Sequence, residues 1–324
     1  MKPNDKIYVA GHKGLVGSAL IRALQAKGYD NIITRTHSQL ELMDKAAVDA
    51  FFNQTKPDYV FLAAAKVGGI WANDNYPADF IYQNLLIQNN IINASKENQV
   101  QRLLFLGSSC IYPRNCPQPI KEDYLLTGTL EATNRPYALA KIAGIELCWA
   151  FNRQFGTKYL AVMPTNLYGP GDNYDLKTSH VIPALIRKMH EAKENNAKQV
   201  VVWGTGTPKR EFLYSDDLAD ACLFLMNLDD QKFNNLISSK ESAPIVNIGC
   251  GEDLTISELA HTIAKVVGFE GEIVFDSTKP DGTPRKVLSV DKIHSLGWEA
   301  RTSLFEGVHR AFLSFMNQDC ITLV

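Results

Sequence analysis

The chain has 324 residues, of which 45% are hydrophobic, so it can bury the core of one large α/β unit and a smaller lobe. Its 33 basic residues are balanced by 35 acidic ones, which gives no reason to expect nucleic acid or an anionic membrane surface as its main partner. The printed sequence opens without a basic-then-apolar segment, and no apolar run reaches the roughly 18 to 20 residues that cross a bilayer. We therefore expect a cytoplasmic protein.

Short apolar runs alternate with amphipathic stretches through the first half of the chain. The runs that we predict as buried parallel strands are Ile7 to Ala10, Asn31 to Thr34, Tyr59 to Ala63, Leu103 to Gly107 and Tyr159 to Pro164. The predicted helices are Val16 to Lys27, Ala78 to Asn98 and Pro136 to Phe155. This alternation predicts an α/β fold with a doubly wound, Rossmann-type parallel sheet.

After residue 168 the alternation loosens into loops rich in Gly, Pro, Asn and Asp. The helix Asp216 to Asn227 and the strand Pro244 to Ile248 are expected to return to the sheet. We therefore predict a sheet domain of residues 1–168 with about 212–230 and 244–249, and a smaller C-terminal α/β substrate lobe of about 169–211 and 250–324.

A glycine-rich turn follows the first predicted strand. It reads Gly11-His12-Lys13-Gly14-Leu15-Val16-Gly17 and opens the first helix. Glycines at this spacing permit a tight reversal, close approach of the backbone to a pyrophosphate, and close packing of helix on strand. A turn without a ligand is the alternative. Because strand, turn and helix follow in the required order, we predict a dinucleotide-binding site.

The residue at the end of the second strand decides which dinucleotide binds, since a carboxylate favours NAD and an arginine favours the 2′-phosphate of NADP. The chain has Arg35 there without an acid beside it, so we expect NADP(H), a solvated surface charge being the alternative. The dinucleotide could also contact Ala63-Ala64-Ala65 after the third strand and Asn84 on the next helix. Packing within the protein would explain these residues equally well.

Tyr137 and Lys141 lie four residues apart on a predicted helix, so that both side chains share one face. A neighbouring cation favours phenolate and should lower the pKa of the phenol from its usual value of about 10. Ser108, at the end of its strand, could bind the same substrate oxygen. These groups suit hydride transfer to or from a carbonyl carbon. Taken alone, the pattern also fits an exposed lysine beside a half-buried tyrosine.

The six cysteines form no Cys-x-x-Cys pair and no His-Cys spacing of a zinc site. We therefore predict reduced thiols and no metal, which leaves Cys110 available for chemistry.

In these residues the chain resembles the extended short-chain dehydrogenase/reductases, and among them the enzymes that act on GDP-4-keto-6-deoxy-D-mannose. The resemblance covers essentially the whole chain. Its Ser-Ser-Cys and Ser-His-Val-Ile-Pro-Ala segments are more specific than the glycine turn and the Tyr-x-x-x-Lys pattern. The matching segments are residues 11–17, 63–70, 107–113, 137–141, 164–170, 179–184 and 279–286.

The resemblance implies a bifunctional enzyme that epimerises carbons 3 and 5 of this sugar and reduces carbon 4 with NADPH, giving GDP-L-fucose. It assigns Cys110 as the base and His180 as the acid, roles that their usual pKa values of about 8.5 and 6.5 would allow. Ser108 and Tyr137 would stabilise the enolate oxygen, with Lys141 beside Tyr137. Tyr137 would then protonate this oxygen during reduction.

The resemblance also implies binding residues. NADP(H) would contact Gly11, His12, Lys13, Gly14, Leu15, Val16, Gly17, Arg35, Ala63, Ala64, Ala65, Asn84, Lys141, Pro164, Thr165, Asn166 and Leu167 of the sheet domain and His180 of the smaller lobe. The GDP-sugar would contact Lys188, Trp203, Arg210 and Asp281. Family members carry arginine at the position of Lys188, and lysine keeps the charge but loses the bidentate fork.

Rival functions remain open. A 4,6-dehydratase of the same family would place an Asp-Glu pair where this chain has Ser109-Cys110, and a 4-epimerase would not need Cys110 and His180 together. A non-catalytic NADP sensor would have no use for Ser108, Tyr137 and Lys141.

Related enzymes are homodimers through two helices of the sheet domain. The apolar stripe Phe80, Ile81, Leu85 and Ile92 could form that interface, and packing in the core would explain it equally well.

Overall fold

The computed structural model describes residues 1–176, 178–279 and 281–321. Its centre is a six-stranded sheet in which every neighbouring pair of strands is parallel. In spatial order the strands are β10 (Ile245–Ile248), β5 (Tyr159–Pro164), β4 (Arg102–Leu106), β3 (Tyr59–Leu62), β1 (Ile7–Ala10) and β2 (Ile32–Ile33). The predicted Rossmann-type class is confirmed, and β2 is shorter than predicted because it pairs with β1 through two residues.

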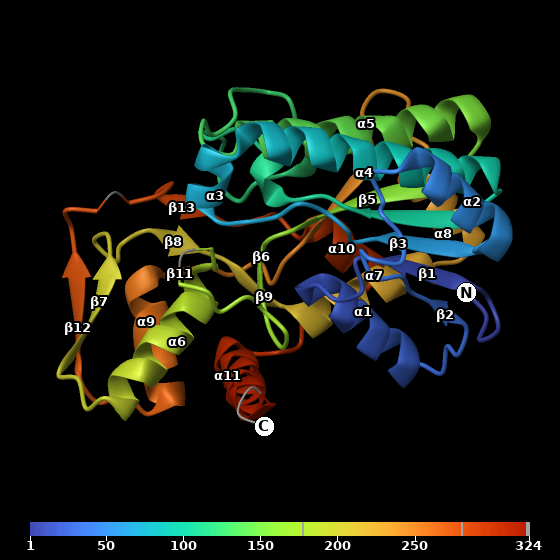
Figure 1. The fold of residues 1–324 in the computed structure, drawn as a ribbon. Coiled ribbons are helices and arrows are strands. Elements are labelled where there is room, and N and C mark those ends of the chain that lie inside the picture. The colour runs from blue at the N-terminus through green and yellow to red at the C-terminus, as the bar shows by residue number, and fades with distance from the viewer. Residues whose placement is uncertain (177, 280, 322–324) are drawn as a thin grey trace.

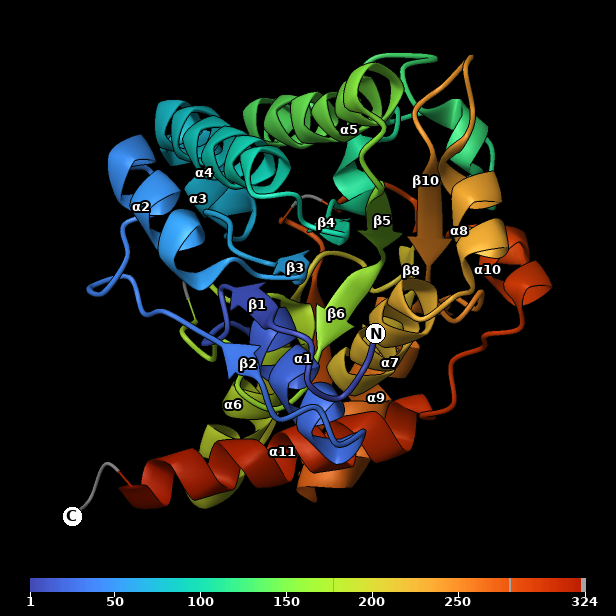
Figure 2. The ribbon, with the colours of Figure 1, turned by 90° about the vertical axis from the view of Figure 1, so that its right-hand side faces the viewer.

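Helices cover both faces of this sheet (Figures 1 and 2). Alternate strand residues face opposite layers: Ile7 and Val9 join one hydrophobic core, and Tyr8 and Ala10 join the other. The first core is covered by α1 (Leu15–Ala26), α7 (Ser215–Met226), α8 (Asp230–Ile237) and α10 (Asp291–Leu296). The second is covered by α2 (Lys45–Thr55), α4 (Pro77–Glu97) and α5 (Arg135–Phe155).

Local sequence signals set the ends of several helices. Asp44 caps α2 by accepting a hydrogen bond from the Ala47 N–H at 3.1 Å. Helix α5 has a proline in its first turn and ends at Gly156, whose φ of +68° lies in the left-handed region. The long helices α1, α4 and α5 therefore begin and end within a residue of their predicted limits.

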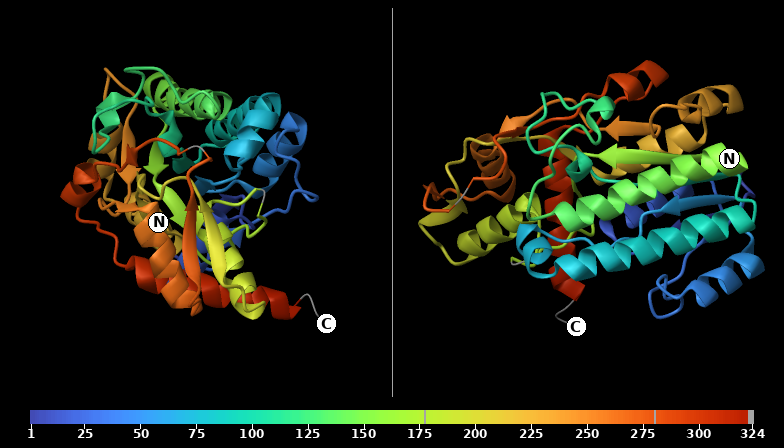
Figure 3. Two further views of the ribbon diagram at one scale, coloured as in Figure 1. Left: turned by 90° about the vertical axis from the view of Figure 1, so that its left-hand side faces the viewer. Right: turned by 90° about the horizontal axis from the view of Figure 1, so that it is seen from above.

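The strand order creates a switch point beside β1. The chain leaves β1 for β2 on one side and then crosses to β3 on the other. In such sheets ligands bind at the carboxyl ends of the strands near this point. In Figure 3 the strands point toward the smaller part of the molecule, so the predicted site residues at strand ends face it.

A third hydrophobic core lies in this smaller part, between α6 (Val181–Glu194), α9 (Ile256–Val267) and α11 (Leu304–Ile321). Its strands are β7 (Gln199–Trp203) with β12 (Glu272–Asp276), β6 (Asn166–Tyr168) with β9 (Phe212–Tyr214), and β8 (Lys209–Arg210) between β11 (Leu254–Thr255) and β13 (Arg285–Lys286). The short elements are α3 (Ile70–Asn75) and the 3₁₀ turns η1 (Ser109–Ile111) and η2 (Glu122–Tyr124).

The division into two domains stays a prediction, although two segments bear on it. Strand β10 pairs with β5, and α7 packs against α1. The core that α1, α7, α8 and α10 cover also contains Val290, Ile293 and Trp298. The predicted division gives these three residues to the smaller lobe. Their packing indicates that residues around α10 lie with the sheet domain.

Among the described residues, no helix is both long enough and apolar enough to span a membrane.

Candidate active site

The glycine turn after β1 is packed tightly at two positions and open at a third. Gly11 has a φ of +85°, and a Cβ there would lie 2.7 Å from the backbone nitrogen of Ala64. A Cβ at Gly17 would lie 2.1 Å from the Gly11 oxygen. Gly14 is the N-cap of α1, and a Cβ there would lie 3.5 Å from the same oxygen. Of the three glycines, Gly14 is therefore the least crowded, and the free N–H groups at the start of α1 would bind a phosphate.

Arg35, at the end of β2, lies beside this turn. The Nδ1 atom of His12 is buried without a hydrogen-bond partner in the described part of the chain. Burial, followed by the charge of Lys13, lowers the pKa of His12, whereas a backbone hydrogen bond at Arg35 raises it. Arg35 is exposed, and its guanidinium lies 5.2 Å from the centroid of the Phe51 ring. An exposed guanidinium and an unsatisfied imidazole nitrogen beside a phosphate-type turn fit a dinucleotide with a 2′-phosphate.

Asn84 holds the loop after β3. Its side chain donates to the carbonyl oxygens of Lys66 at 3.0 Å and Phe80 at 2.7 Å, and it accepts from the Lys66 N–H at 3.0 Å. These bonds use its polar atoms, so the structure favours the packing role that the sequence left open. Ala63 and Ala64 lie against Gly11, where a larger side chain would separate β3 from the turn. Ala65 is half-buried in the same loop.

Ser108 and Cys110 follow β4 in a tight turn. Gly107, just before this turn, packs closely against Met163 of β5. A Cβ at this position would lie 2.2 Å from Cε of Met163, so a side chain would clash there. The thiol of Cys110 donates to Oγ of Ser108 with a sulfur–oxygen distance of 3.1 Å. The backbone N–H of Cys110 donates to the same oxygen at 3.4 Å. The hydroxyl and the thiol therefore form one unit at the carboxyl end of β4.

Tyr137 and Lys141 reach this unit from the first turns of α5. Lys141 is 3% exposed, and its ammonium donates to the Leu106 carbonyl at 2.7 Å. Its nitrogen lies 5.8 Å from the centroid of the Tyr137 ring. A hydrogen bond from Ser108 favours the phenolate form of Tyr137. The structure thus brings Ser108, Tyr137 and Lys141 together, as the sequence predicted.

Burial shifts the pKa values of Tyr137 and Lys141 toward their neutral forms. It raises the pKa of Tyr137, and the charge on ionised Cys110 raises it further, against the hydrogen bond with Ser108. It lowers the pKa of Lys141 to about 8. The sequence predicted a phenol whose pKa is lowered by Lys141, and this direction is wrong because desolvation of the phenol is the larger effect.

The Cys110 thiol is subject to the same effect. Burial raises its pKa, and the charge of Lys286 is the largest influence that lowers it, ahead of the hydrogen bond with Ser108 and the charge of Lys141. The sequence did not single out Lys286. The available signal was its place at the end of the matching segment 279–286.

His180 is the N-cap of α6 and is exposed. Surrounding protein atoms nevertheless desolvate its ring and lower its pKa. A Cβ on Gly69, in the loop after β3, would lie 3.5 Å from the carbonyl oxygen of Ser179, so this loop abuts the start of α6. Within the described residues, no hydrogen bond joins His180 to Ser108 or Cys110. Its role as the acid stays a prediction.

The segment Pro164-Thr165-Asn166-Leu167 joins the sheet to the smaller part of the chain. The Thr165 N–H donates to the Ile248 carbonyl at 3.1 Å. The Thr165 hydroxyl and the Asn166 side-chain amide donate to the Glu211 carbonyl at 3.3 and 2.8 Å. Leu167 packs against the core that α1, α7, α8 and α10 cover. These bonds fix the backbone that was predicted to contact the cofactor.

Glu211 is another residue that the sequence did not single out. It is fully buried, and burial raises its pKa. Its carboxylate accepts from the Gly251 N–H at 2.7 Å and the Leu288 N–H at 2.9 Å. It therefore ties the loop after β10 and the segment after β13 to the end of β8.

Trp203, at the end of β7, is 68% exposed and has two cations near its ring. The ammonium groups of Lys188 and Lys279 are each 5.7 Å from the centroid of its ring. Lys188 and Trp203 were predicted together, whereas Lys279 was not singled out. An exposed aromatic face with adjacent cations suits a nucleotide base and its phosphates.

Arg210 and Asp281 lie close to each other. A Cβ on Gly282 would lie 2.8 Å from a guanidinium nitrogen of Arg210. Burial lowers the pKa of Arg210, and the charge of Asp281 raises it. The Asp281 carboxylate accepts from the N–H of Thr205 at 2.9 Å and from its hydroxyl at 2.7 Å. Asp281 thus holds the loop that carries Trp203, and Pro280 of the same motif lies outside the described residues.

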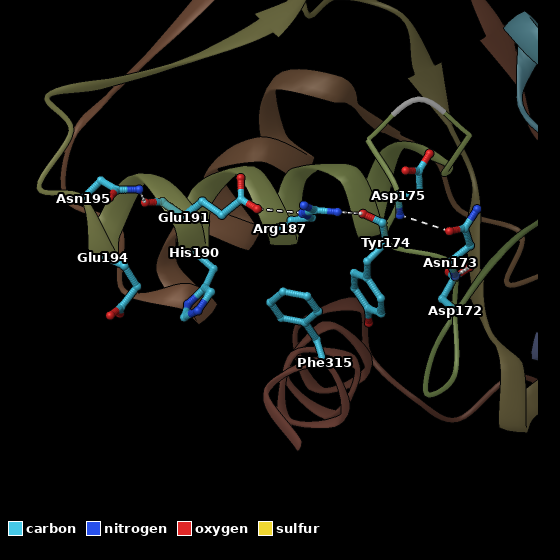
Figure 4. A pocket seen from close by; sticks show the side chains of 10 residues that line it. All are labelled: Asp172, Asn173, Tyr174, Asp175, Arg187, His190, Glu191, Glu194, Asn195 and Phe315. Atoms are coloured by element: carbon cyan, nitrogen blue, oxygen red, sulfur yellow. Dashed lines mark hydrogen bonds and ion pairs between the residues drawn. The ribbon is translucent and has the colours of Figure 1, made fainter. Parts of the chain in front are cut away.

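A pocket of about 630 Å³ opens elsewhere on the molecule, between α6, the 172–175 loop and α11 (Figure 4). Arg187, His190, Glu191 and Phe315 are among its lining residues. None of the predicted catalytic, cofactor or substrate residues lines it. This pocket therefore lies apart from the site residues that the sequence predicted.

The chain is similar to known proteins over nearly its whole length. The profile of the NAD dependent epimerase/dehydratase family matches residues 7–249. The GDP-L-fucose synthase of Escherichia coli (strain K12) is 54% identical, over 97% of this chain and 98% of its own length. GDP-L-fucose synthase 1 of Arabidopsis thaliana is 54% identical, over 97% of this chain and 94% of its own length.

Among solved structures, a GDP-mannoheptose C4 reductase from Campylobacter jejuni with NADP bound has a TM-score of 0.89 and 42% sequence identity. The match covers 98% of this chain and 99% of that one. These similarities, together with the matching glycine turn and Tyr-x-x-x-Lys pair, show that the chain belongs to the NAD dependent epimerase/dehydratase family.

Proposed function

We propose that this chain uses NADPH to convert GDP-4-keto-6-deoxy-D-mannose into GDP-L-fucose, by epimerisation at carbons 3 and 5 and reduction at carbon 4. The observation that carries the proposal is the contact of 3.1 Å between Sγ of Cys110 and Oγ of Ser108, beside Tyr137 and Lys141. It supports a base next to the donor for a carbonyl oxygen, which reduction alone would not need. The names of the two relatives at 54% identity support the same reaction.

Epimerisation requires a base, an acid and a site for negative charge. In a 4-ketohexose the protons on carbons 3 and 5 are acidified, since their removal gives an enolate on the carbonyl oxygen. Cys110, as thiolate, takes the proton, and His180 returns one to the opposite face of the ring. Tyr137 and Ser108 donate hydrogen bonds to the oxygen. The raised pKa of Tyr137 supports this role, because it keeps the phenol protonated and able to donate.

Reduction uses the same tyrosine as an acid. NADPH, when bound, supplies the hydride for carbon 4. Tyr137 gives its proton to the oxygen as negative charge develops there, and the ammonium of Lys141 stabilises the phenolate that remains. The Lys141 pKa of about 8 leaves this ammonium charged at neutral pH. Its bond to the Leu106 carbonyl fixes it beside the phenol.

NADP(H) would lie along the carboxyl ends of β1, β2 and β3. The N–H groups at the start of α1 would bind the pyrophosphate, and Arg35 would bind the 2′-phosphate. Ala63 to Ala65 would let the adenosine half approach the backbone after β3. The segment 164–167 would support the nicotinamide end near Lys141 and His180.

The GDP part of the substrate would lie in the smaller part of the molecule. Trp203 offers an exposed aromatic face for the base, and Lys188 and Arg210 offer charges for the diphosphate. Asp281 would act through the Thr205 loop, since its carboxylate is bonded there. In this arrangement the diphosphate would lie next to Arg210.

A reductase without epimerase activity is the second candidate, because the related Campylobacter jejuni protein is described as a GDP-mannoheptose C4 reductase. Such an enzyme would not need Cys110 beside Ser108. A 4-epimerase and a non-catalytic NADP sensor fit less well, since neither uses the thiol together with the phenol and the buried lysine.

We also propose a cytoplasmic homodimer joined through α4 and α5. These helices lie side by side on the outer surface of the sheet domain (Figure 3). Of the predicted stripe, Phe80 and Ile92 are buried within the chain and cannot reach a partner. Tyr82 on α4 and Leu139 on α5 are 64% and 43% exposed, so a partner could contact them.

Replacing Arg35 with alanine should remove the preference for NADPH. The ratio of kcat/KM values for NADPH and NADH is expected to fall by about 10- to 100-fold, because a charge-assisted contact with the 2′-phosphate contributes roughly 1.5–3 kcal/mol. Steady-state kinetics with both cofactors measures the ratio. Arg153→Ala, at the exposed end of α5, is the control and should leave it unchanged. A ratio that does not move in Arg35→Ala removes the assignment.

The parent chain should oxidise NADPH with GDP-4-keto-6-deoxy-D-mannose and exchange solvent deuterium into carbons 3 and 5. Tyr137→Phe should lose NADPH oxidation by about 100-fold or more, since the proton for the oxygen is missing, and should keep a slower deuterium exchange, because Ser108 still donates to the enolate oxygen. Absorbance follows the cofactor and mass spectrometry follows the deuterium. Oxidation by the parent without exchange would favour the reductase, and no reaction would favour the sensor. Parallel loss of both activities in the variant contradicts separate roles.

Cys110→Ser should bind NADPH normally and lose deuterium exchange by about 100-fold or more, because a hydroxyl is a far weaker base than a thiolate at neutral pH. Fluorescence titration measures binding, and mass spectrometry measures exchange. Cys116→Ser, six residues further along the same loop, is the matched control and should exchange at the parent rate. Exchange at the parent rate in Cys110→Ser would mean that another residue is the base.

The double substitution Tyr82→Glu and Leu139→Glu should convert the dimer into a monomer, because two charges would be buried in the interface. Sedimentation velocity of the parent and the double variant measures this change. Leu313→Glu, on an exposed position of α11, should leave the dimer intact. A monomeric parent, or a dimeric double variant, would exclude this interface.

A further inference from the structure

We propose that Glu211 is a positioning residue whose carboxylate fixes the strand of Arg210 relative to the segment 164–167, so that carbon 4 of the bound sugar lies within reach of the hydride. The inference rests on the proposed function, in which Arg210 binds the diphosphate and the segment 164–167 supports the nicotinamide end of NADPH. It assigns a task to a fully buried acid that the sequence did not single out.

The carboxylate of Glu211 bonds to both neighbours of the strand that carries Arg210. Strand β8 lies between β11 and β13, and Glu211 directly follows it. Oε1 of Glu211 accepts from the Gly251 N–H at 2.7 Å, just before β11. Oε2 accepts from the Leu288 N–H at 2.9 Å, just after β13. One side chain therefore connects the central strand of this small sheet to the ends of its two outer strands.

The backbone of Glu211 bonds to the segment proposed to support the cofactor. Its carbonyl oxygen accepts from the Thr165 hydroxyl at 3.3 Å and from the Asn166 side-chain amide at 2.8 Å. Arg210, proposed to bind the diphosphate, is the preceding residue in the chain. A shift of Glu211 would therefore change the distance between the two proposed binding regions.

The protein packs closely around this carboxylate. Glu211 is fully buried, and a Cβ on Gly249 would lie 2.1 Å from its Oε1. Gly249 follows β10, whose last residue, Ile248, accepts from the Thr165 N–H at 3.1 Å. The carboxylate thus has little room to move, as a residue that sets the positions of others requires.

The contacts call for two acceptor oxygens on one side chain. A carboxylate accepts at both oxygens, whereas glutamine of the same shape would place an NH₂ group against one of the two N–H groups. Burial raises the pKa of Glu211, and the hydrogen bonds from Leu288 and Gly251 oppose this. Aspartate would keep both acceptors on a shorter side chain. A role in positioning therefore predicts that aspartate replaces Glu211 better than glutamine, and a role in filling space predicts the reverse.

The first test measures the binding of GDP and of NADPH to the full chain by isothermal titration calorimetry. Glu211→Gln should raise the Kd for GDP about tenfold, and Glu211→Asp should raise it less. The Kd for NADPH should stay within about twofold, because its phosphates are proposed to bind at α1 and Arg35. Glu252→Gln makes the same chemical change at an exposed position of the nearby loop and should leave both Kd values unchanged.

A double-mutant cycle shows whether Glu211 acts through Arg210. Arg210→Ala should itself weaken GDP binding. In the Arg210→Ala background, Glu211→Gln should change the Kd for GDP by less than about twofold, because the group that it positions is gone. Losses that add, or an Arg210→Ala variant that binds GDP as the parent does, would overturn the proposal.

Kinetics and unfolding separate positioning from stability alone. At saturating sugar, kcat for NADPH oxidation by Glu211→Gln should fall about 100-fold, since a misplacement of about 1 Å can have this effect. A lower unfolding midpoint with parent values of kcat and of the Kd for GDP would overturn the proposal. A greater loss in Glu211→Asp than in Glu211→Gln would do the same.

If Glu211→Gln does not fold, the same measurements are made on Glu211→Asp and on Gly249→Ala, whose Cβ would displace Oε1. Both should weaken GDP binding and keep NADPH binding, and parent Kd values for GDP in both would overturn the proposal. A parent that binds NADPH but not GDP would refute the proposed substrate and this inference with it. A parent that binds GDP, with variants that bind it equally well, would refute this inference and leave the proposed function standing.

Discussion

Burial favours the uncharged forms of the ionisable side chains at the end of β4, and the proposed chemistry depends on how this effect is balanced. The phenol of Tyr137 is half-buried, and its desolvation keeps it protonated, so that it serves as a donor and an acid. The half-buried thiol of Cys110 is also desolvated and is a poor base unless a cation stabilises its charge. The same low-dielectric surroundings strengthen that cation's effect. One constraint thus gives Tyr137 and Cys110 opposite roles, although they share Ser108 as a neighbour.

The fold collects the required partners from distant parts of the sequence. Lys141 comes from α5 and bonds to the Leu106 carbonyl at the end of β4, Ser108 and Cys110 follow β4 itself, and His180 stands at the start of α6. The glycine turn opens at the same edge, beside the switch point of the strand order. Glu211 and Asp281 do not supply the chemistry, but they hold the loops on which Arg210 and Trp203 lie. The site is therefore built from short contacts between segments that are far apart in the chain.

Features that depend on local spacing could be predicted from the sequence. The apolar runs gave the parallel strands, the glycine spacing gave the turn before α1, and the interval between Tyr137 and Lys141 placed both on one face of α5. Features that depend on long-range packing could not. The direction of the phenol pKa follows from desolvation, and the use of Asn84 to hold Lys66 follows from a loop conformation. The pairing of β13 with β8, which sets Lys286 opposite Arg210, joins segments far apart in the chain and is not revealed by spacing alone.

The central claim is that a thiol and an imidazole flank a keto-sugar on opposite faces, with the oxygen bound by a hydroxyl and a phenol. A crystal structure of the chain with NADP⁺ and GDP-4-keto-6-deoxy-D-mannose tests it most directly. The claim predicts that Sγ of Cys110 and a ring nitrogen of His180 lie on opposite sides of the pyranose, near carbons 3 and 5. It also predicts hydrogen bonds of about 2.6–3.2 Å from Ser108 and Tyr137 to the carbonyl oxygen. A sugar bound with both groups on one face, or with either group out of reach of the ring, would contradict the account.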